Sequence, residues 1–586
     1  MHTGRISKNM IWAVTIISIL TLTLKAEAKT FFVSPTGNNI SSGSTIDSPL
    51  KSINKAITEA AAGDTIYVLP GIYNELINFQ DKHGLPENAI YLFGYSTKTE
   101  NYPVLDGGAK KPLPDGSNDW IHMENSAWIE IARIKFDNGW TYPINIDNSS
   151  YISFDSCIFN GGKRVINVKG VLSNHILVEN CYWDQGGELL WKIEKDSEGV
   201  EAWLSMHHKG MGYYNGSIID FSGTGGSIVI RKNTIVNAFN AIRFRGKKGF
   251  DSNIEIYDNN ISNIRDNDFE PEYFTYNLLI YHNFSHNIHR TLSVDNVEGG
   301  NIYYFGNVIT SDGDPWTIKI CSGQGKVYGK EKLLNFPLYI FNNSYYGWGK
   351  AFRMDAGKAV RLKHFNNAYC FCSDDGFILN EWDKTNEFDN DISNKPWPEN
   401  ILKNKQEQAG IISDPKFVDP AGKNLILLPG SKSIDAGRVM SFSEFGWTQK
   451  FAGKAPDAGA YENGKLVEGP PFRFLTTPEL KIEYREKPRI VRYYNDSNCV
   501  TLYFSEEIDA ASVNKETVSL FNGNENLKIN DVTFPRNGYE MVINTSSIKS
   551  GGELSLLFKK MPIGKNGENS TYWASTIKIH KNTGTN

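Results

Sequence analysis

Short strands with alternating apolar positions recur along the central part of the chain at a nearly constant interval. Four of them align without gaps, at residues 227–233 (SIVIRKN), 253–259 (NIEIYDN), 277–283 (NLLIYHN) and 301–307 (NIYYFGN). Each is apolar at its second and fourth positions, which is the pattern of a strand with one buried face. Each also ends in an asparagine, and this residue recurs along the chain as Asn233, Asn259, Asn283, Asn307, Asn343 and Asn367.

These asparagines are separated by 26, 24, 24, 36 and 24 residues, and the longest interval holds an insertion around residues 323–335. A period near 24 residues built from short strands predicts a solenoid, in which successive coils stack their strands into parallel sheets. A buried asparagine at the same turn of every coil can hydrogen-bond to the coils above and below it. Leucine-rich repeats have a similar period but need a regular leucine framework, which this sequence lacks. We therefore expect an all-β solenoid.

One amphipathic helix is expected near the start of the solenoid. Ser48 can cap its N-terminus, Pro49 suits its first turn, and Gly63 follows its end. Its apolar face consists of Leu50, Ile53, Ile57 and Ala60. Such a helix can cover the open end of the solenoid, where the core and the strand edges would otherwise be exposed.

Both ends of the repeat region resemble the pectin-lyase-like superfamily of right-handed parallel β-helices. The opening segment, residues 31–75, includes SPLKSINKAITEAAAGDTIYVLPGIYNE, and the closing segments, residues 414–437 and 456–462, include SKSIDAG and PDAGAYE. They are similar to the first and last coils of secreted bacterial members. The resemblance implies a right-handed parallel β-helix over residues 29–462. It implies no single activity, because this scaffold carries lyases, hydrolases, epimerases and adhesins.

The beginning of the chain has the features of a signal peptide, residues 1–28. A charged start with Arg5 and Lys8 is followed by an apolar run and by the cleavage sequence AEA. Cleavage after Ala28 and export to the periplasm or out of the cell are therefore expected.

The end of the chain departs from the repeat pattern. A break rich in glycine and proline opens a predicted linker, residues 463–475. Residues 476–586 then contain alternating strands, among them CVTLYF at residues 499–504 and ELSLLFK at residues 553–559. This part is similar to bacterial Ig-like modules, and we expect a small β-sandwich that acts as an accessory domain.

Composition limits the kinds of partner. The chain is 40% hydrophobic and 22% charged with a net charge of −5, which gives no reason to expect nucleic acid. Beyond the signal peptide no apolar run is long enough to span a membrane. The six cysteines lack the spacing of a zinc site, and Cys157 and Cys181 are expected to be either stacked thiols or a disulfide. We expect a monomer whose partner is a polysaccharide.

The strand that follows each asparagine turn is expected to line a groove on the outer face of the solenoid. Strict alternation points its apolar side chains inward, and these are Ile242, Phe244, Phe269, Leu292, Val294, Ile318 and Phe352. The outward positions then include three acids, Glu270, Glu272 and Asp295. Neighbouring coils stack about 4.8 Å apart, so the three carboxyl groups should converge. We predict that they are the catalytic residues.

Cations and aromatic residues around these acids are predicted to bind substrate. The outward cations are Lys192, Arg243, Arg245, Lys319 and Arg353, and Trp316 precedes one of these strands. A long insertion between residues 195 and 226 adds Trp203, His207 and His208, which can wall the groove. Several cations along one groove favour an anionic polysaccharide, a uronate or a sulfate.

Three functions remain open at this point. The first, which we expect, is a glycoside hydrolase that uses two of the acids as acid and base or nucleophile and needs no cofactor. The second is a polysaccharide lyase or epimerase that binds Ca²⁺ through Glu270, Glu272 and Asp268. Glu270-x-Glu272 resembles the calcium-binding acidic pair of chondroitinase-B and alginate-lyase β-helices, although the basic residues that follow that pair are missing. The third is a glycan-binding, adhesin-like solenoid.

Overall fold

The computed structural model describes residues 28–470, 490–558 and 576–579, with internal gaps. The gaps longer than three residues are 110–118, 187–213, 247–251, 313–317, 355–359, 443–446 and 549–553. The predicted signal peptide, except Ala28, therefore lies outside the described residues. In the described part of the chain, no helix is long and apolar enough to cross a membrane.

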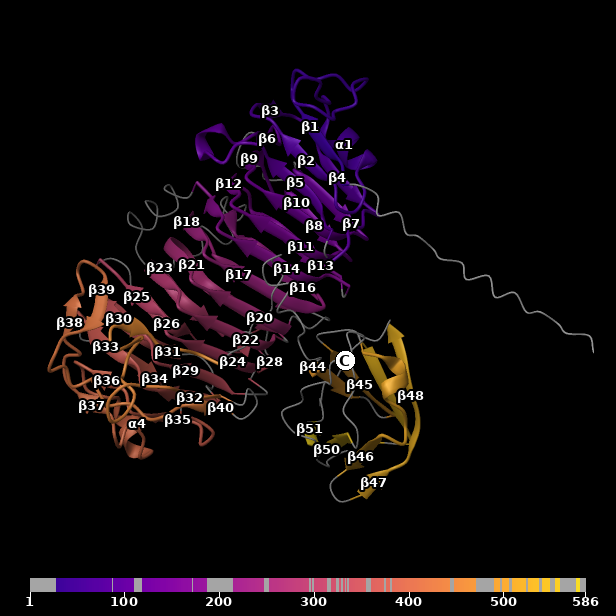
Figure 1. Cartoon of the computed structure of the whole chain (residues 1–586). Coiled ribbons are helices and arrows are strands. Elements are labelled where there is room, and N and C mark those ends of the chain that lie inside the picture. Colours follow the sequence, from indigo (N-terminus) through magenta and orange to yellow (C-terminus); the bar gives the residue numbers. More distant parts are fainter. Residues whose placement is uncertain are drawn as a thin grey trace, which may run out of the picture.

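Parallel strands stack in three rows along the molecule, and each coil contributes a strand to each row in turn (Figure 1). The first row consists of β1 (Thr30–Val33), β2 (Thr65–Val68), β5 (Ile90–Gly94), β8 (Ala127–Ala132), β11 (Ser150–Asp155), β14 (Asn174–Glu179), β17 (Gly226–Arg231), β20 (Ser252–Tyr257), β22 (Tyr276–Tyr281), β24 (Gly300–Phe305), β29 (Leu338–Phe341), β32 (Leu362–Phe365) and β35 (Glu387–Asp389). This arrangement is the predicted parallel β-helix.

The second row follows the asparagine turn of each coil. It consists of β3 (Ile72–Tyr73), β6 (Val104–Asp106), β9 (Lys135–Gly139), β12 (Ile158–Gly161), β15 (Tyr182–Asp184), β18 (Thr234–Ala238), β21 (Asn260–Tyr273), β23 (Phe284–Ser293), β25 (Val308–Thr310), β30 (Ser344–Gly347), β33 (Ala368–Phe371), β36 (Ile392–Ser393) and β37 (Ile411–Ile412). The strands β21 and β23 are long enough to continue into the third row without a break.

The third row carries the charged outward side chains of the candidate active site. It consists of β4 (Ile77–Gln80), β7 (Ile121–Glu124), β10 (Ile144–Asp147), β13 (Arg164–Lys169), β16 (Ser217–Ser222), β19 (Ile242–Gly246), the second halves of β21 and β23, β26 (Ile318–Ser322), β31 (Gly349–Met354) and β34 (Phe377–Leu379).

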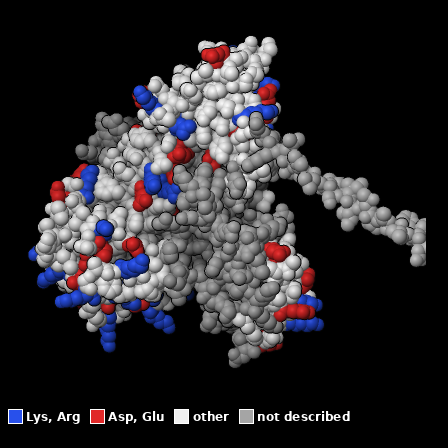
Figure 2. All heavy atoms as spheres, viewed as in Figure 1, with Lys and Arg blue, Asp and Glu red and all other residues white. Residues whose placement is uncertain are grey.

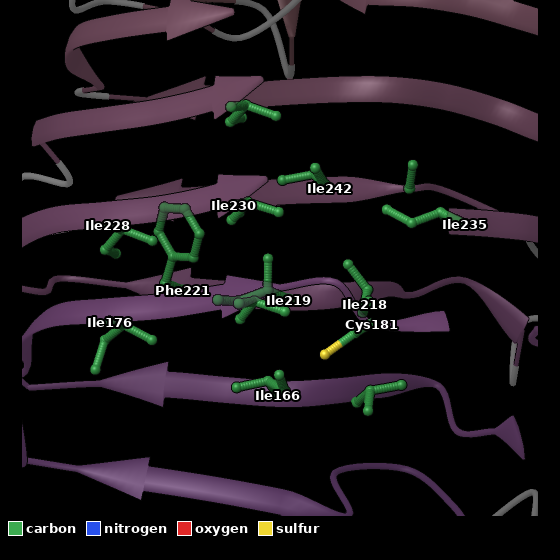
Figure 3. Packing of buried hydrophobic residues seen from close by; sticks show 14 of the residues in the cluster. Ile166, Ile176, Cys181, Ile218, Ile219, Phe221, Ile228, Ile230, Ile235 and Ile242 are labelled. Carbon is green, nitrogen blue, oxygen red and sulfur yellow. The ribbon is translucent and has the colours of Figure 1, made fainter. Parts of the chain in front are cut away.

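Apolar side chains from all three rows fill the interior. Ile166, Ile219 and Ile242 lie in register on successive coils and are fully buried, and Figure 3 shows them among the isoleucines of neighbouring strands. Stacking these branched side chains removes apolar surface from water along the whole interior. This burial is the main source of stability in such a fold.

A ladder of buried asparagines joins consecutive coils, as the repeat predicts. Each side-chain amide donates to the side-chain oxygen one coil further on, with N···O distances of 2.9–3.1 Å. Its members are Asn233, Asn259, Asn283, Asn307, Asn343 and Asn367, and Asp391 accepts the last bond. The residue before each member is left-handed, for example Asp258 with φ of 55° and Gly306 with φ of 61°. The ladder therefore fixes how each coil sits on the next.

Two cysteines occupy the same turn in earlier coils. Cys157 and Cys181 are buried free thiols that are not joined by a disulfide bond. Of the two alternatives that the sequence leaves open, stacked thiols are therefore the correct one. The backbone N–H of Cys181 donates to Asn233 Oδ1 over 2.9 Å, which joins the thiol positions to the start of the ladder.

The predicted helix is present but begins later than expected. It is α1 (Ile53–Glu59), and Ser52, not Ser48, caps it by accepting a hydrogen bond from the Lys55 N–H. The backbone of Leu50 is instead bonded to Phe32 in β1, which keeps that segment extended. Ile53, Ala56 and Ile57 are buried against the first coil, so the helix covers the end of the core.

Shorter elements interrupt or follow the coils of the solenoid. They are η1 (Thr99–Asn101), the hairpin β27 (Lys326–Val327) and β28 (Lys330–Glu331), α4 (Glu399–Lys403), and the hairpins β38 (Phe417–Asp419) with β39 (Asn424–Leu427), β40 (Ser441–Phe442) with β41 (Trp447–Thr448), and β42 (Tyr461–Glu462) with β43 (Lys465–Leu466). The side chains of Phe442 and Trp447 pack over an outward aromatic stack on the first row that includes Tyr303 and Phe341.

Two antiparallel sheets with a core of their own lie near the C-terminus. One sheet contains, in spatial order, β44 (Ile490–Asn495), β45 (Cys499–Phe504), β49 (Glu540–Thr545) and β48 (Ile529–Arg536). The other sheet contains, in spatial order, β47 (Glu525–Leu527), β46 (Val518–Asn522), β50 (Leu554–Phe558) and β51 (Thr576–Ile579). A short helix, η5 (Ala510–Ser512), lies between β45 and β46 in sequence.

The ladder gives a direct prediction about stability. Asn283→Ala removes an amide that donates to the next coil and an oxygen that accepts from Asn259, so buried groups are left unpaired. Each such group costs about 1–3 kcal/mol, and the free energy of unfolding from urea titration should fall accordingly. Asn78→Ala, at an exposed position of β4, is the control and should change it little. Equal effects of the two substitutions would contradict a stabilising role of the ladder.

Candidate active site

The outward positions of four consecutive strands in the third row bring charged side chains into register. Asn167 of β13 pairs with Asp220 of β16, which pairs with Arg243 of β19, which pairs with Glu270 of β21. The alternating neighbours Ile242, Phe244, Phe269 and Leu292 are fully buried, as strict alternation predicts. Figure 2 shows acidic and basic side chains interspersed over the described surface in this view.

Arg243 binds both of the acids that the sequence analysis placed beside it. Its Nε lies 2.9 Å from Glu270 Oε2 and its Nη2 lies 3.3 Å from Glu272 Oε2. Its Nη1 donates to Asn215 Oδ1 over 3.1 Å. Burial opposes the positive charge, but the combined attraction of nearby carboxylates, led by those of Glu270 and Glu272, raises the pKa of the Arg243 guanidinium. All three charged side chains are about 15% exposed, so this is a largely enclosed ion-pair network.

Asp220 holds two further arginines. Its Oδ2 lies 3.1 Å from Arg164 Nε, and its Oδ1 accepts from Arg245 Nη2 over 2.9 Å. The carboxyl group is fully buried. From the sequence, Asp220 is expected in the long insertion, because residues 195–226 together have the features of one loop. The apolar residues of SIIDFS at 217–222 were the signal that β16 is an ordinary strand of the coil.

Lys163 completes the group and was missed from the sequence. It precedes β13 and is half-buried. Burial, followed by repulsion from Arg164, Arg245 and Arg243, lowers the pKa of its ammonium group. Within the described part of the chain this ammonium group forms no ion pair. An amine in such surroundings can lose its proton more easily than an ordinary lysine.

Asp268 lies apart from the other predicted metal ligands. Its Oδ2 accepts a hydrogen bond from Ser285 over 2.6 Å in the interior, and burial raises the pKa of its carboxyl group. The other two acids, Glu270 and Glu272, are paired with Arg243. Calcium needs several carboxylate oxygens directed at one point without a competing cation. The described side chains of Asp268, Glu270 and Glu272 therefore do not fit a calcium site.

The remaining predicted residues divide into two groups. Asp295, Trp316, Lys192, Trp203, His207 and His208 lie outside the described residues. For Lys319 and Arg353 the backbone is described: Lys319 lies opposite Arg290, and Arg353 lies opposite Ser322.

The register of Lys319 differs from the predicted one. Cys321, not Ile318, lies opposite the inward Leu292. Alternation within residues 316–319 predicts an inward Ile318 and an outward Lys319. Between β25 and β26 the chain runs from Thr310 to Ile318, whereas between β18 and β19 it runs only from Ala238 to Ile242. After this longer connection Lys319 lies opposite Arg290, two residues before the partner of Leu292.

No protein-family model matches the chain. A curated protein, pectate lyase PEL9 of Emericella nidulans, is 29% identical over 193 residues, which are 32% of this chain and 45% of that protein. The matched segment thus spans less than half of the relative's length.

Solved structures to which the chain is similar include pectate lyase Pel9A and the PL6 family alginate lyase AlyGC. Pel9A is 15% identical with a TM-score of 0.39 and covers 74% of this chain and 96% of its own. AlyGC is 12% identical with a TM-score of 0.40 and covers 70% of this chain and 60% of its own.

Three rows of parallel strands joined coil by coil confirm the fold that the resemblance to the pectin-lyase-like superfamily implies. The chain folds as a parallel β-helix. The expectation of a glycoside hydrolase is wrong, since the curated relative is named as a lyase. The geometry gives a physical reason. The predicted acid and base, Glu270 and Glu272, both pair with Arg243, so neither is placed to give a proton to a leaving group.

Removing the buried carboxylate tests the charged network. Asp220→Ala leaves Arg164 and Arg245 without their shared partner, and breaking a buried pair of this kind costs about 3–5 kcal/mol. The free energy of unfolding should fall by about that amount. Asp147→Ala is the matched control, because Asp147 pairs with the exposed Lys169 on the same row and should cost less than about 1 kcal/mol. A small effect at Asp220 would show that water replaces the carboxylate.

Proposed function

We propose that the chain is a polysaccharide lyase that cleaves a uronate polymer by β-elimination. The observation that carries the proposal is the amine of Lys163, whose pKa is lowered by burial and by three neighbouring arginines. A general base and cations that can neutralise a carboxylate are the two requirements of this reaction.

Each requirement has a residue to meet it. The base takes the proton from the carbon next to the uronate carboxylate, and the electron pair forms a double bond to the carbon that carries the glycosidic oxygen. That oxygen leaves with the bonding electrons and takes up a proton. Lys163 in its neutral form is the proposed base. Arg245 and Arg164, which share one carboxylate between them, are the proposed partners of the uronate carboxylate.

The charges of the cluster favour an anionic substrate. Four cations, Lys163, Arg164, Arg243 and Arg245, face three carboxylates, those of Asp220, Glu270 and Glu272. The cluster therefore carries one excess positive charge while Lys163 is protonated, and this form attracts a uronate more strongly than a neutral sugar. In the neutral form of Lys163 that acts as base, three arginines balance three carboxylates, so the uronate carboxylate is then held by arginine N–H groups and not by excess charge.

The relative supports the choice of polymer. It is named as a pectate lyase and shares 29% identity over 193 residues, so pectate is the first substrate to test. A polymer of this kind lies outside the cell, which agrees with the export predicted from residues 1–28. The proposed reaction routes no step through calcium at Asp268, Glu270 and Glu272, because these side chains do not fit that ion.

The reaction gives a chromophore that can be followed directly. The purified protein incubated with polygalacturonate should produce the near-ultraviolet absorbance of an unsaturated uronate. Lys163→Ala should lower this rate about 10²–10⁴-fold, because a general base contributes that much. Lys169→Ala, which removes an exposed lysine at the end of the strand that Lys163 precedes, should leave the rate unchanged. New reducing ends without absorbance, or full activity in Lys163→Ala, would refute the proposal, and binding without cleavage would favour a glycan-binding protein.

The pH dependence tests the role of Lys163 independently. Only the neutral amine can take a proton, so kcat/KM should rise with pH through the pKa of Lys163. Arg245→Gln removes one of the charges that lower this pKa, so the midpoint of the profile should move to higher pH. Lys135→Gln, which removes a cation from the second row, should leave the midpoint in place. An unshifted profile in Arg245→Gln would mean that another group is the base.

A further inference from the structure

Three buried side chains with metal-binding atoms meet at the C-terminal end of the solenoid. His364 lies in β32, Asp391 lies in the turn before β36, and Glu407 lies in the loop after α4. Among the described His, Cys, Asp and Glu residues, these form the one group of three whose ligand atoms all lie within 4.8 Å of one another. Their exposed fractions are 1%, 1% and 5%.

The atoms that converge lack ordinary partners. His364 Nδ1 contacts Asp391 Oδ2, and among the described residues no group outside these three side chains hydrogen-bonds to either atom or to Glu407 Oε1. No described lysine or arginine forms an ion pair with either carboxyl group. Two buried carboxyl groups without a cation are costly, because a buried charge needs a partner of opposite sign.

The opposite atoms of the same side chains are held in place. His364 Nε2 lies 2.7 Å from the Tyr369 hydroxyl. Asp391 Oδ1 accepts from the backbone N–H and the amide of Asn367, over 2.6 and 3.0 Å. Glu407 Oε2 accepts from the Asp391 N–H over 3.3 Å. Metal ligands in proteins are oriented in this way by a second layer of hydrogen bonds. Nε2 also lies 3.3 Å from the Asn367 side-chain amide nitrogen. Metal binding requires the tautomer in which Nε2 carries the proton and donates it to the Tyr369 hydroxyl, so that the lone pair of Nδ1 faces the two carboxyl groups.

We propose that His364, Asp391 and Glu407 bind a divalent transition-metal ion, with Zn²⁺ as the best candidate. A dication balances the two carboxylates, and the imidazole favours zinc over calcium or magnesium, which prefer oxygen ligands alone. Zinc bonds to nitrogen and oxygen are about 2.0–2.2 Å long, so ligand atoms this close need to move little.

The role of the ion follows from its surroundings. Asp391 ends the asparagine ladder, and Glu407 belongs to the loop that follows the last helix of the solenoid. An ion held by both would fasten that loop to the final coils. The site is enclosed and far along the chain from Lys163, so it stabilises the fold and is independent of the proposed lyase reaction.

Metal content and thermal unfolding of the full chain test this proposal. After dialysis against metal-free buffer, the purified protein should retain about one equivalent of zinc by elemental analysis. A strong chelator should lower Tm by several degrees, and Zn²⁺, but not Mg²⁺, should restore it. Protein without retained zinc whose Tm ignores both chelator and added Zn²⁺ would overturn the proposal and indicate a proton shared between Asp391 and Glu407.

Variants of the ligands separate metal loss from misfolding. Asp391→Asn keeps the oxygen that Asn367 needs but loses the charge, so zinc should fall to background while the protein folds. Glu407→Gln should act in the same way, and Glu399→Gln, an exposed acid on α4, should keep its zinc. As a second readout, Co²⁺ added to the metal-free protein should give visible absorption that both ligand variants lose. Full zinc content in Asp391→Asn would also refute the assignment.

Discussion

The hydrogen bond between one asparagine amide and the next governs this structure. It requires the same turn in every coil, with a left-handed residue directly before the asparagine, as at Asp258 and Gly306. That turn fixes the register in which the strands of one coil pair with those of the next. The outward side chains of the third row are therefore also aligned from coil to coil. Arg243 lies beside Glu270 because Asn233 and Asn259 hold their two coils in register.

Local regularity made most of the fold predictable. The apolar alternation and the recurrent asparagine identify the strands, the parallel stacking and the inward side chains such as Ile242 and Phe269, because each follows from a period of two or of 24 residues. Arg243, Glu270 and Glu272 were placed together for the same reason. Predictions failed where connections vary in length, as they do before Lys319.

Long-range contacts were beyond the reach of the sequence. Asp220 belongs to a strand that follows an insertion, so counting along the chain misplaced it. Lys163 has no distinctive neighbours in sequence, and its unusual proton affinity arises from arginines on other coils. Strict alternation predicts that Asp268, next to the inward Phe269, points outward. Its side chain is instead buried, because its strand continues through the corner between two rows and its carboxyl group accepts a hydrogen bond from Ser285. Such features depend on the path of the chain at the corners.

The extent of the ladder divides the solenoid into two unequal parts. From residue 233 to residue 391 each coil is joined to the next by amide bonds, whereas at Cys157 and Cys181 the same turn offers thiols, which are weak donors. In a stack of repeats, cooperativity depends on the coupling between nearest neighbours. From Asn233 onward a chain of amide bonds is therefore added to the parallel strand pairing. The earlier coils depend on strand pairing and on the hydroxyl bonds of Ser149 and Ser173 instead. A force that pulls the coils apart along the solenoid axis should meet its greatest resistance within the ladder.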